Sequence, residues 1–230
     1  MIALAKREFF DSFKSIKSLL IILFTTLVSW QTAQYLSSNP LLIQEAAVQG
    51  KESEFVTAVT AFIVISLGFL FVFSVSHDII NKEIEGKTIR LLVTKKPRSQ
   101  IMFGKFLGTL LFWVAIFSIS YLVTSLIAQV WVTEEYLRMV AFLTYIVGMV
   151  FLVSTLVERT KLTMFIGVFA GIIIPILGIA STIVDKWWMI GIEYLLPYTY
   201  IEKGFLMIIP FLMGLMFFLI SMKIMSGKDL

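Results

Sequence analysis

Cysteine is absent from the 230 residues, and only one histidine, His77, is present. The lack of cysteine excludes disulfide bonds, thiolate metal sites and cysteine nucleophiles. Charged residues make up only 15% of the chain, whereas a soluble domain carries about a quarter. No G-x-S-x-G motif occurs, so a serine hydrolase of that type has no support. These absences leave the chain few groups with which to do chemistry by itself.

Apolar residues are abundant instead. They make up 59% of the chain, with 21 Phe and 11 Met, and the mean hydropathy is +0.94. They occur in uninterrupted blocks close to the roughly 20 residues that an α-helix needs to cross a bilayer. We therefore expect an all-α polytopic membrane protein, with residues 1–230 forming one domain of six transmembrane helices. The expected spans are Leu19–Tyr35, Ala58–Ser76, Phe106–Val132, Met139–Val157, Leu162–Val184 and Phe205–Met222.

Two of these spans have unusual features. The third is long enough to tilt or to extend beyond the lipid. Pro175 in the fifth predicts a kink or a broken helix. None of the six expected spans contains Asp, Glu, Lys, Arg or His. Because ion-coupled carriers usually place such groups within the membrane, a proton-driven pump is disfavoured, and a passive channel, a scaffold or a transporter powered from elsewhere remain open.

Lysine and arginine are distributed unevenly between the segments that connect the spans. Residues 1–17 and 78–105, the short fourth connection and the C-terminus together hold fifteen of the nineteen. The alternate connections hold the other four, which are Lys51, Arg138, Lys186 and Lys203. Because positively charged loops tend to stay in the cytoplasm, the asymmetry predicts cytoplasmic N- and C-termini in a multi-pass protein of the cell (plasma) membrane.

Residues 1–17 have the pattern of an amphipathic helix that lies along the membrane surface. Apolar side chains recur at helical spacing, namely Ile2, Phe9, Phe13 and Ile16. Basic side chains suited to anionic headgroups are Lys6, Arg7, Lys14 and Lys17. A secretory signal peptide is the rival interpretation, but acidic residues precede the apolar run and no A-x-A site follows it.

The outer segment 185–204 is rich in aromatic residues, namely Trp187, Trp188, Tyr194, Tyr198 and Tyr200. Such rings favour the level of the lipid headgroups, so we expect this segment to lie along or to dip into the outer interface. The membrane-interface residues predicted from both segments are Lys6, Arg7, Phe9, Phe13, Trp187 and Trp188.

Three short motifs suggest chemistry, but each is incomplete. Residues 86–88 read G-K-T, which matches the last three positions of the P-loop motif G-x-x-x-x-G-K-[ST]. Asn81, however, stands at the position of the leading glycine, and no strand precedes the motif. Residues 134–138 are similar to the E-E-x-x-x-R box of intramembrane CAAX-type proteases, but one residue is missing between Glu and Arg. His77 and Asp78 lack the further ligands that a metal site needs. We therefore expect no catalytic, cofactor or metal site in this chain.

Residues 78–105 form the longest inside segment and hold seven lysines and arginines. The stretch from Ile79 to Val93 is compatible with a short amphipathic helix, which Pro97 ends, and Ser99 is placed to cap the next helix. Its apolar face would consist of Ile80, Ile84, Leu91 and Leu92. Such a helix could dock into a groove on a partner or lie on the lipid surface, and its spacing alone does not decide between these.

The loop follows a spaced pattern that reads E-x-E-x-G-T-[IL]-x-L-L-L-[ST]-x-P-[VI]-S-R and then G-K. The matching positions are Glu83, Glu85, Thr88, Ile89, Leu91, Leu92, Thr94, Pro97, Ser99, Gly104 and Lys105. In this respect it resembles the first cytoplasmic loop of type-2 ABC transporter permeases. Residues 6–9 and 11–12 are similar to the elbow helix of that family, so the resemblance covers the chain. This sequence differs at residues 85–88, which read E-G-K-T, and at residues 97–100, which read P-R-S-Q.

The resemblance implies that the short helix between the second and third spans is a cytoplasmic coupling helix. It also implies three partners: a separate ABC ATPase subunit that binds ATP-Mg, a second permease copy or homologous permease, and the lipid membrane. It implies no nucleic acid. The residues expected to couple the chain to the ATPase are Glu83, Glu85, Gly86, Thr88, Leu91, Leu92 and Pro97.

We therefore expect a permease subunit of an ABC exporter that moves an amphipathic peptide, antimicrobial or lipid-like substrate outward. The alternative is a non-transporting membrane interaction protein, such as an immunity or sensor subunit against a peptide toxin. A passive channel is a further alternative. The chain itself is not expected to be an enzyme, because it lacks ATPase motifs.

Overall fold

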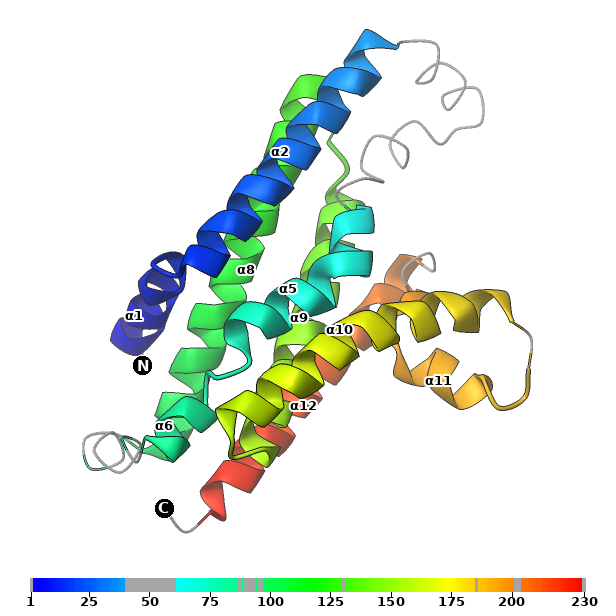
Figure 1. Ribbon diagram of the computed structural model, residues 1–230. Helices are drawn as coiled ribbons and strands as arrows, with labels where there is room; N and C mark the ends of the chain where they lie inside the picture. The colour runs from blue at the N-terminus through cyan, green and yellow to red at the C-terminus, as the bar shows by residue number, and fades with distance from the viewer. Residues whose placement is uncertain are drawn as a thin grey trace.

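All regular secondary structure is helical in the computed structural model, which describes residues 2–39, 61–86, 88, 94, 97–129, 131–184, 186–200 and 204–228. The α-helices are α1 (Ile2–Phe13), α2 (Ile16–Ser38), α5 (Gly68–Ser76), α6 (Asn81–Glu85), α8 (Arg98–Ala128), α9 (Thr133–Leu156), α10 (Thr160–Ile183), α11 (Ile190–Leu195) and α12 (Ile208–Ser226) (Figure 1). A π-helix, η1 (Ile63–Leu67), leads into α5, and two short 3₁₀-helices, η2 (Pro197–Tyr200) and η3 (Gly204–Met207), precede α12.

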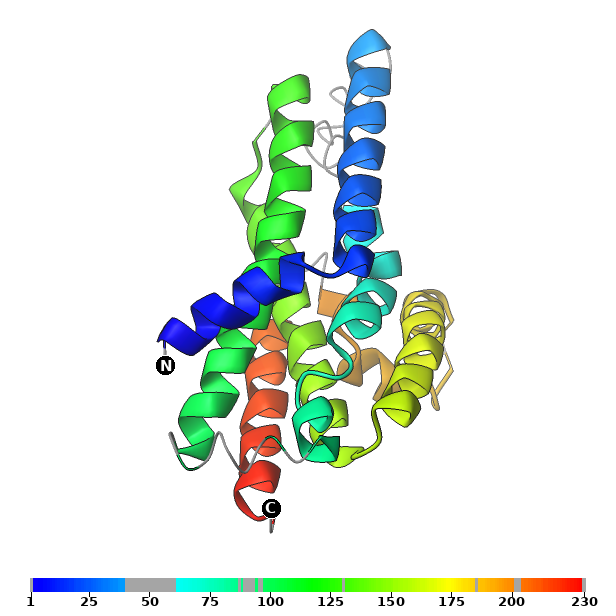
Figure 2. The ribbon, with the colours of Figure 1, turned by 60° about the vertical axis from the view of Figure 1, so that its left-hand side comes forward.

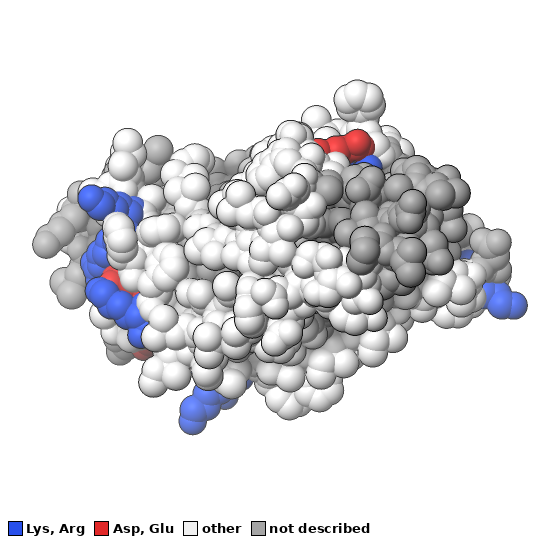
Figure 3. Space-filling view, turned by 90° about the horizontal axis from the view of Figure 1, so that it is seen from above, with Lys and Arg blue, Asp and Glu red and all other residues white. Residues whose placement is uncertain are grey.

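Six helical stretches are long and apolar enough to cross a membrane, as predicted. They are Ile16–Ser38, Ile63–Glu85, Arg98–Ala128, Thr133–Leu156, Thr160–Ser181 and Gly204–Ser226. Both termini lie toward the same end of the bundle as α6, and α11 lies away from that end (Figure 1). On the face drawn in Figure 3, the charged side chains gather toward the two ends and a broad uncharged surface separates them. This distribution suits a bundle that is surrounded by lipid at its middle.

The third span is displaced toward the loop relative to its predicted bounds, 106–132. Pro97 has an extended backbone and forms the N-cap, so α8 begins at Arg98, and Ser99 lies inside the helix instead of capping it. Gln129 adopts a left-handed conformation, with φ of 54°, and ends the helix. At 1.5 Å per residue the 31 residues of α8 extend about 46 Å, which exceeds the roughly 30 Å of a bilayer core. The helix therefore reaches beyond the hydrocarbon region, as its predicted length suggested.

One further expectation about helix boundaries is wrong, and another is narrowed. The helix expected over residues 1–17 is shorter, because α1 ends at Phe13 and the extended backbone of Ser15 precedes α2. Figure 2 shows that α1 lies at an angle to α2 and crosses α8. In the fifth span α10 continues through Pro175, so of the two predicted alternatives the broken helix does not occur and the kink stays a prediction.

Small residues allow the helices around α8 to approach closely. α2 packs against α8 with the small buried residues Ser18, Thr25, Ser29 and Ala33 on its inner face. α1 crosses α8 at Gly108, where an added Cβ would lie 2.6 Å from the backbone oxygen of Ala5. In a membrane, where lipid is as apolar as the helix surface, such close packing is the main source of helix association. α1, α2 and α8 therefore form one packed group.

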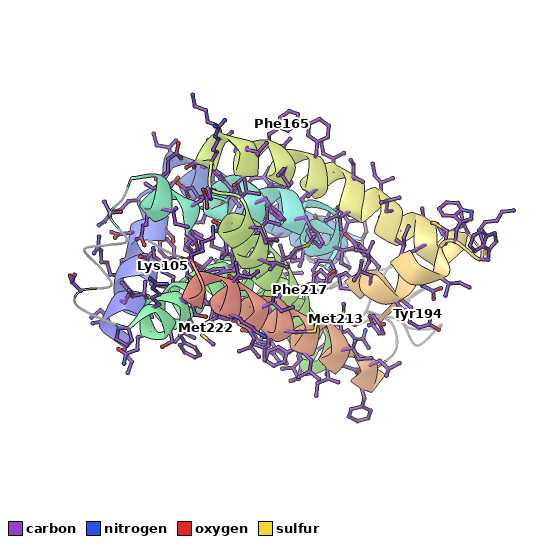
Figure 4. The ribbon with its side chains drawn as sticks, turned by 90° about the horizontal axis from the view of Figure 1, so that it is seen from below. Lys105, Phe165, Tyr194, Met213, Phe217 and Met222 are labelled. Atoms are coloured by element: carbon purple, nitrogen blue, oxygen red, sulfur yellow. The ribbon has the colours of Figure 1, made fainter. Side chains whose placement is uncertain are left out.

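The crossing of α9 and α12 is equally close. An added Cβ at Gly148 would lie 2.1 Å from the carbonyl oxygen of Gly214, and one at Gly214 would lie 2.4 Å from that of Thr144. Near this crossing, the Phe218 ring stacks on Phe106 of α8 with their centroids 4.2 Å apart. These contacts join α12 to both α9 and α8. By contrast, α10 leaves much of its surface uncovered, and Phe165 points away from the bundle (Figure 4).

Candidate functional site

An ion-pair cluster joins α6 to two other helices. Lys105 Nζ on α8 lies 2.9 Å from Glu8 Oε1 on α1 and 2.8 Å from Glu83 Oε1 on α6. The Lys105 side chain is only 5% exposed, and those of the two glutamates are 20% exposed. Figure 4 places Lys105 toward the end of the molecule opposite Tyr194. The predicted coupling residue Glu83 is therefore bound within the chain, and it connects α6 to α1 and α8.

Glu85, the second acidic residue of the predicted motif, faces a different helix. Its Oε2 accepts a hydrogen bond from the backbone N–H of Thr160, 3.1 Å away, and another from the Thr160 hydroxyl. Thr160 is the first residue of α10, where the backbone N–H groups have no partner inside the helix. A carboxylate at this position also interacts favourably with the helix dipole. Glu85 thus connects the end of α6 to the beginning of α10.

Asn81, the first residue of α6, forms a third connection. Its side chain is fully buried and donates a hydrogen bond to the Thr163 hydroxyl of α10. The backbone N–H groups of Ile80 and Asn81 both donate to the Ser154 hydroxyl of α9, at 3.1 and 3.3 Å. Buried polar groups of this kind are costly to leave unpaired. α6 is therefore held to α9 and α10 as well as to α1 and α8.

The apolar residues of α6 also face the bundle. Ile80, just before the helix, is 1% exposed and belongs to the core, and Ile84 packs against that core from a partly buried position. We expected both side chains on a face that could dock into a partner. They instead complete the attachment of α6, because burial of apolar surface within the chain is the more favourable arrangement.

A polar cleft of about 830 Å³ opens between α1, α6 and the start of α8. Its charged lining consists of Arg7, Glu8, Asp11, Asp78, Lys82, Glu83 and Lys105. A hydrogen bond from Lys14 lowers the pKa of the Asp11 carboxyl below its ordinary value, with a smaller contribution from Arg7. Asp11 therefore stays ionised near neutral pH, and the cleft carries charges of both signs.

The remaining predicted coupling residues lie around this cleft or outside the described residues. Gly86 ends α6, and the Thr88 hydroxyl lies 3.4 Å from the backbone oxygen of Glu83. The helix expected over residues 79–93 is shorter, because α6 ends at Glu85, and Pro97, which was expected to end that helix, is instead the N-cap of α8. Leu91 and Leu92 fall outside the residues that the structure describes, and their docking role stays a prediction.

A comparison with models of known families found one that covers most of the chain. The model described as ABC-2 family transporter protein matches residues 2–193. The chain belongs to this family. A search of curated proteins found no match. The family assignment and the six apolar helices make the chain a multi-pass membrane protein that forms a permease domain, and not an ATPase.

The incomplete catalytic motifs of this ABC-2 permease have ordinary structural roles. Arg138 pairs with Glu134 at 2.8 Å and with Glu135 at 2.5 Å, all within the first turns of α9. His77 follows α5, and its Nδ1 lies 3.1 Å from the carbonyl oxygen of Phe73. These contacts lie at the ends of α9 and α5.

The predicted membrane-interface residues divide into two groups. Lys6 and Arg7 are exposed on α1, and Trp187 and Trp188 are 83% and 53% exposed before α11. These four positions are free to contact headgroups, which stays a prediction. Phe9 and Phe13 face the bundle instead, since both are partly buried against the core and Phe13 packs edge-on against Phe112 of α8 at 4.8 Å. The large exposed apolar side chains of α1 are Ile2 and Phe10.

The described part of the aromatic segment, residues 186–200, folds back onto the ABC-2 bundle. Tyr198 of η2 is 5% exposed, contacts Gly178 of α10, and donates from its hydroxyl to the backbone oxygen of Ile65, 2.9 Å away. That oxygen lies in the π-helix η1. Tyr145 of α9 donates to the backbone oxygen of Leu195 at 2.9 Å. Only part of the aromatic segment is therefore available to lipid.

Four residues of the α6 attachment were not identified from the sequence, namely Asn81, Ser154, Thr160 and Thr163. Glu8 and Lys105 were noticed as parts of the family pattern, but their contact with Glu83 was not. Lys105 carried a signal, because it is an ionisable residue next to a long apolar run. Thr160 carried another, since a threonine at the start of an apolar helix is a frequent capping residue.

Proposed function

We propose that this ABC-2 permease is the membrane-spanning subunit of an exporter in the plasma membrane, with both termini in the cytoplasm. A separate ABC ATPase supplies the energy, and a second permease copy or a homologous permease completes the path. The substrate is an amphipathic peptide, an antimicrobial or a lipid-like molecule. The apolar, Phe-rich spans support this substrate class, and the excess of Lys and Arg in the inner segments supports the orientation.

The observation that carries the proposal is the attachment of α6 to four other helices. Glu83 connects it to α1 and α8 through Lys105, and Asn81 connects it to α9 and α10. A short helix at the end of a bundle can pass on a displacement only if it is firmly held to the elements that must move. A load that an ATPase applies to this loop therefore reaches the transmembrane helices without first deforming α6.

Co-purification tests the proposal. The full chain carries an affinity tag, is extracted in detergent, and its partners are identified by mass spectrometry. We expect a protein with ATPase motifs, and we expect vesicles that contain both chains to hydrolyse Mg-ATP. The double variant Leu91→Glu, Leu92→Glu should lose the ATPase, whereas the matched control Leu91→Ile, Leu92→Ile should keep it.

Recovery of the wild-type chain without any ATPase subunit would contradict the proposal. Recovery of a bound peptide toxin, with no ATPase, would instead favour the non-transporting immunity or sensor subunit. A conductance in lipid bilayers that needs no ATP would favour a passive channel.

A further inference from the structure

Lys105 is the only described charged side chain that touches both α1 and α6, according to the ion pairs found in the described ranges. It lies on α8, where its side chain is almost completely buried. Each of its two carboxylate partners comes from a different helix, and neither partner contacts the other helix through an ion pair. The ion-pair link between α1 and α6 therefore passes through one ammonium group.

We propose that Lys105 is a positioning residue that locks α1, α6 and α8 into a single body, so that the surface helix α1 follows α6 when the loop is displaced. This inference rests on the proposed function for its role in transport, but the lock itself is a property of the isolated chain. Both sides of the cleft between α1 and α6 then belong to one rigid unit.

The charge balance explains why the lysine is needed. With Lys105 present, one positive group lies between two negative groups, for a formal charge of −1. Without it, the carboxylates of Glu8 and Glu83 would face each other in the partly buried wall of the cleft, with a formal charge of −2. Like charges at short range in such a region repel strongly. Loss of the lysine therefore does more than remove a tie, because it drives α1 and α6 apart.

The ties from α6 to α9 and α10 differ from this cluster in their chemistry. They are hydrogen bonds to hydroxyl and backbone groups, from Asn81 to Ser154 and Thr163 and from Thr160 to Glu85. None of them involves α1. A change at Lys105 should consequently release α1 from α6 while α6 stays attached to α9 and α10.

Spin labels measure this directly. The chain has no cysteine, so labels can be attached at Lys6→Cys on α1 and Lys82→Cys on α6 without removal of native residues. The Lys82 side chain is 75% exposed and Lys6 is exposed, so both positions accept a label. In the purified permease alone, we expect one narrow distance distribution for the otherwise unchanged chain and a broad one, shifted to longer distances, for Lys105→Met.

The matched control is Arg138→Met. Arg138 is likewise a largely buried cation between two carboxylates, but all three groups belong to α9, so its loss separates no helices. This control should keep the narrow distribution. If Lys105→Met fails to fold, the exchanged variant Lys105→Glu, Glu83→Lys retains one cation between two carboxylates and should also keep the narrow distribution. A narrow, unshifted distribution in folded Lys105→Met, or a broad one in the folded exchanged variant, would overturn the proposal.

A second arm uses the permease bound to its ATPase. In the unaltered complex, the α1–α6 distance should be the same in the nucleotide-free and the vanadate-trapped states. In Lys105→Met, the ATP-driven movement of α1 per ATP hydrolysed should be about tenfold smaller than in the unaltered complex. A change in this distance in the unaltered complex would overturn the rigid lock. If no ATPase is recovered, the proposed function fails, but the measurements on the permease alone still decide the role of Lys105.

Discussion

Replacement of Gly148 with alanine should weaken the crossing of α9 and α12. The added Cβ would lie 2.1 Å from the Gly214 carbonyl oxygen, and the three nearest atoms all belong to the Gly214 backbone. A backbone cannot rotate away as a flexible side chain can, so the two helices must separate. Alanine gains about 1 kcal/mol over glycine inside a helix, whereas overpacking costs up to about 3 kcal/mol, which leaves a net loss of about 2 kcal/mol.

Equilibrium unfolding in mixed micelles, followed by far-UV circular dichroism, measures this change. A loss of about 2 kcal/mol corresponds to an unfolding constant that is about 30-fold larger. Gly191 supplies the matched control, because it lies in α11 and an added Cβ there would meet nothing within 4 Å. Gly191→Ala should leave the free energy of unfolding unchanged or raise it by up to about 1 kcal/mol. Equal stabilities of the two variants would refute the close crossing of α9 and α12.

Three other outcomes follow from the described contacts. Lys105→Met should lower the free energy of unfolding by about 3–5 kcal/mol, because the substitution leaves two largely buried carboxylates without a cation. The same unfolding titration measures this loss, and a loss no greater than that of Arg138→Met would contradict the prediction. Tyr198→Phe should cost about 1 kcal/mol and speed proteolysis of residues 186–200, because the hydrogen bond to the Ile65 oxygen is lost; an unchanged cleavage rate would count against this contact. In a variant that keeps only the tryptophan at position 187, lipids brominated near the headgroup should quench the tryptophan fluorescence more than lipids brominated at the chain end. Quenching by aqueous iodide that is stronger than quenching by either lipid would show that the ring lies in water.

The candidate site shows how far a sequence pattern extends. The pattern E-x-E located Glu83 and Glu85 and placed them on a short helix before the third span, and both lie on α6. The pattern could not say which way the two carboxylates point. On a helix, residues two apart lie on different sides, and the structure turns one toward Lys105 and the other toward Thr160. Docking on a partner was the expectation, and attachment within the chain is what the described contacts establish.

Burial explains the other differences. Phe9 and Phe13 fit the apolar face of a surface helix, but that periodicity is the same whether the face meets lipid or another helix. Gly104 and Gly108 of α8 decided the matter, because their lack of a side chain lets α1 approach α8 closely, and α8 then covers part of those rings. The periodicity of residues 1–17 carries no information about which side chains the neighbouring helix presents to them.

Local chemistry by itself determined the number of spans and the all-helical class, because both depend on how much apolar surface a contiguous stretch carries and on the need to pair backbone groups within each segment in lipid. The order of the residues likewise sufficed to show that the three short motifs are incomplete. Only the tertiary structure decided which charges meet. Glu8, Glu83 and Lys105 are far apart along the chain, and their pairing depends on the angle at which α1 crosses α8 and on the position at which α6 packs beneath the bundle. Such long-range contacts are set by the packing of whole helices, which no short stretch of residues encodes.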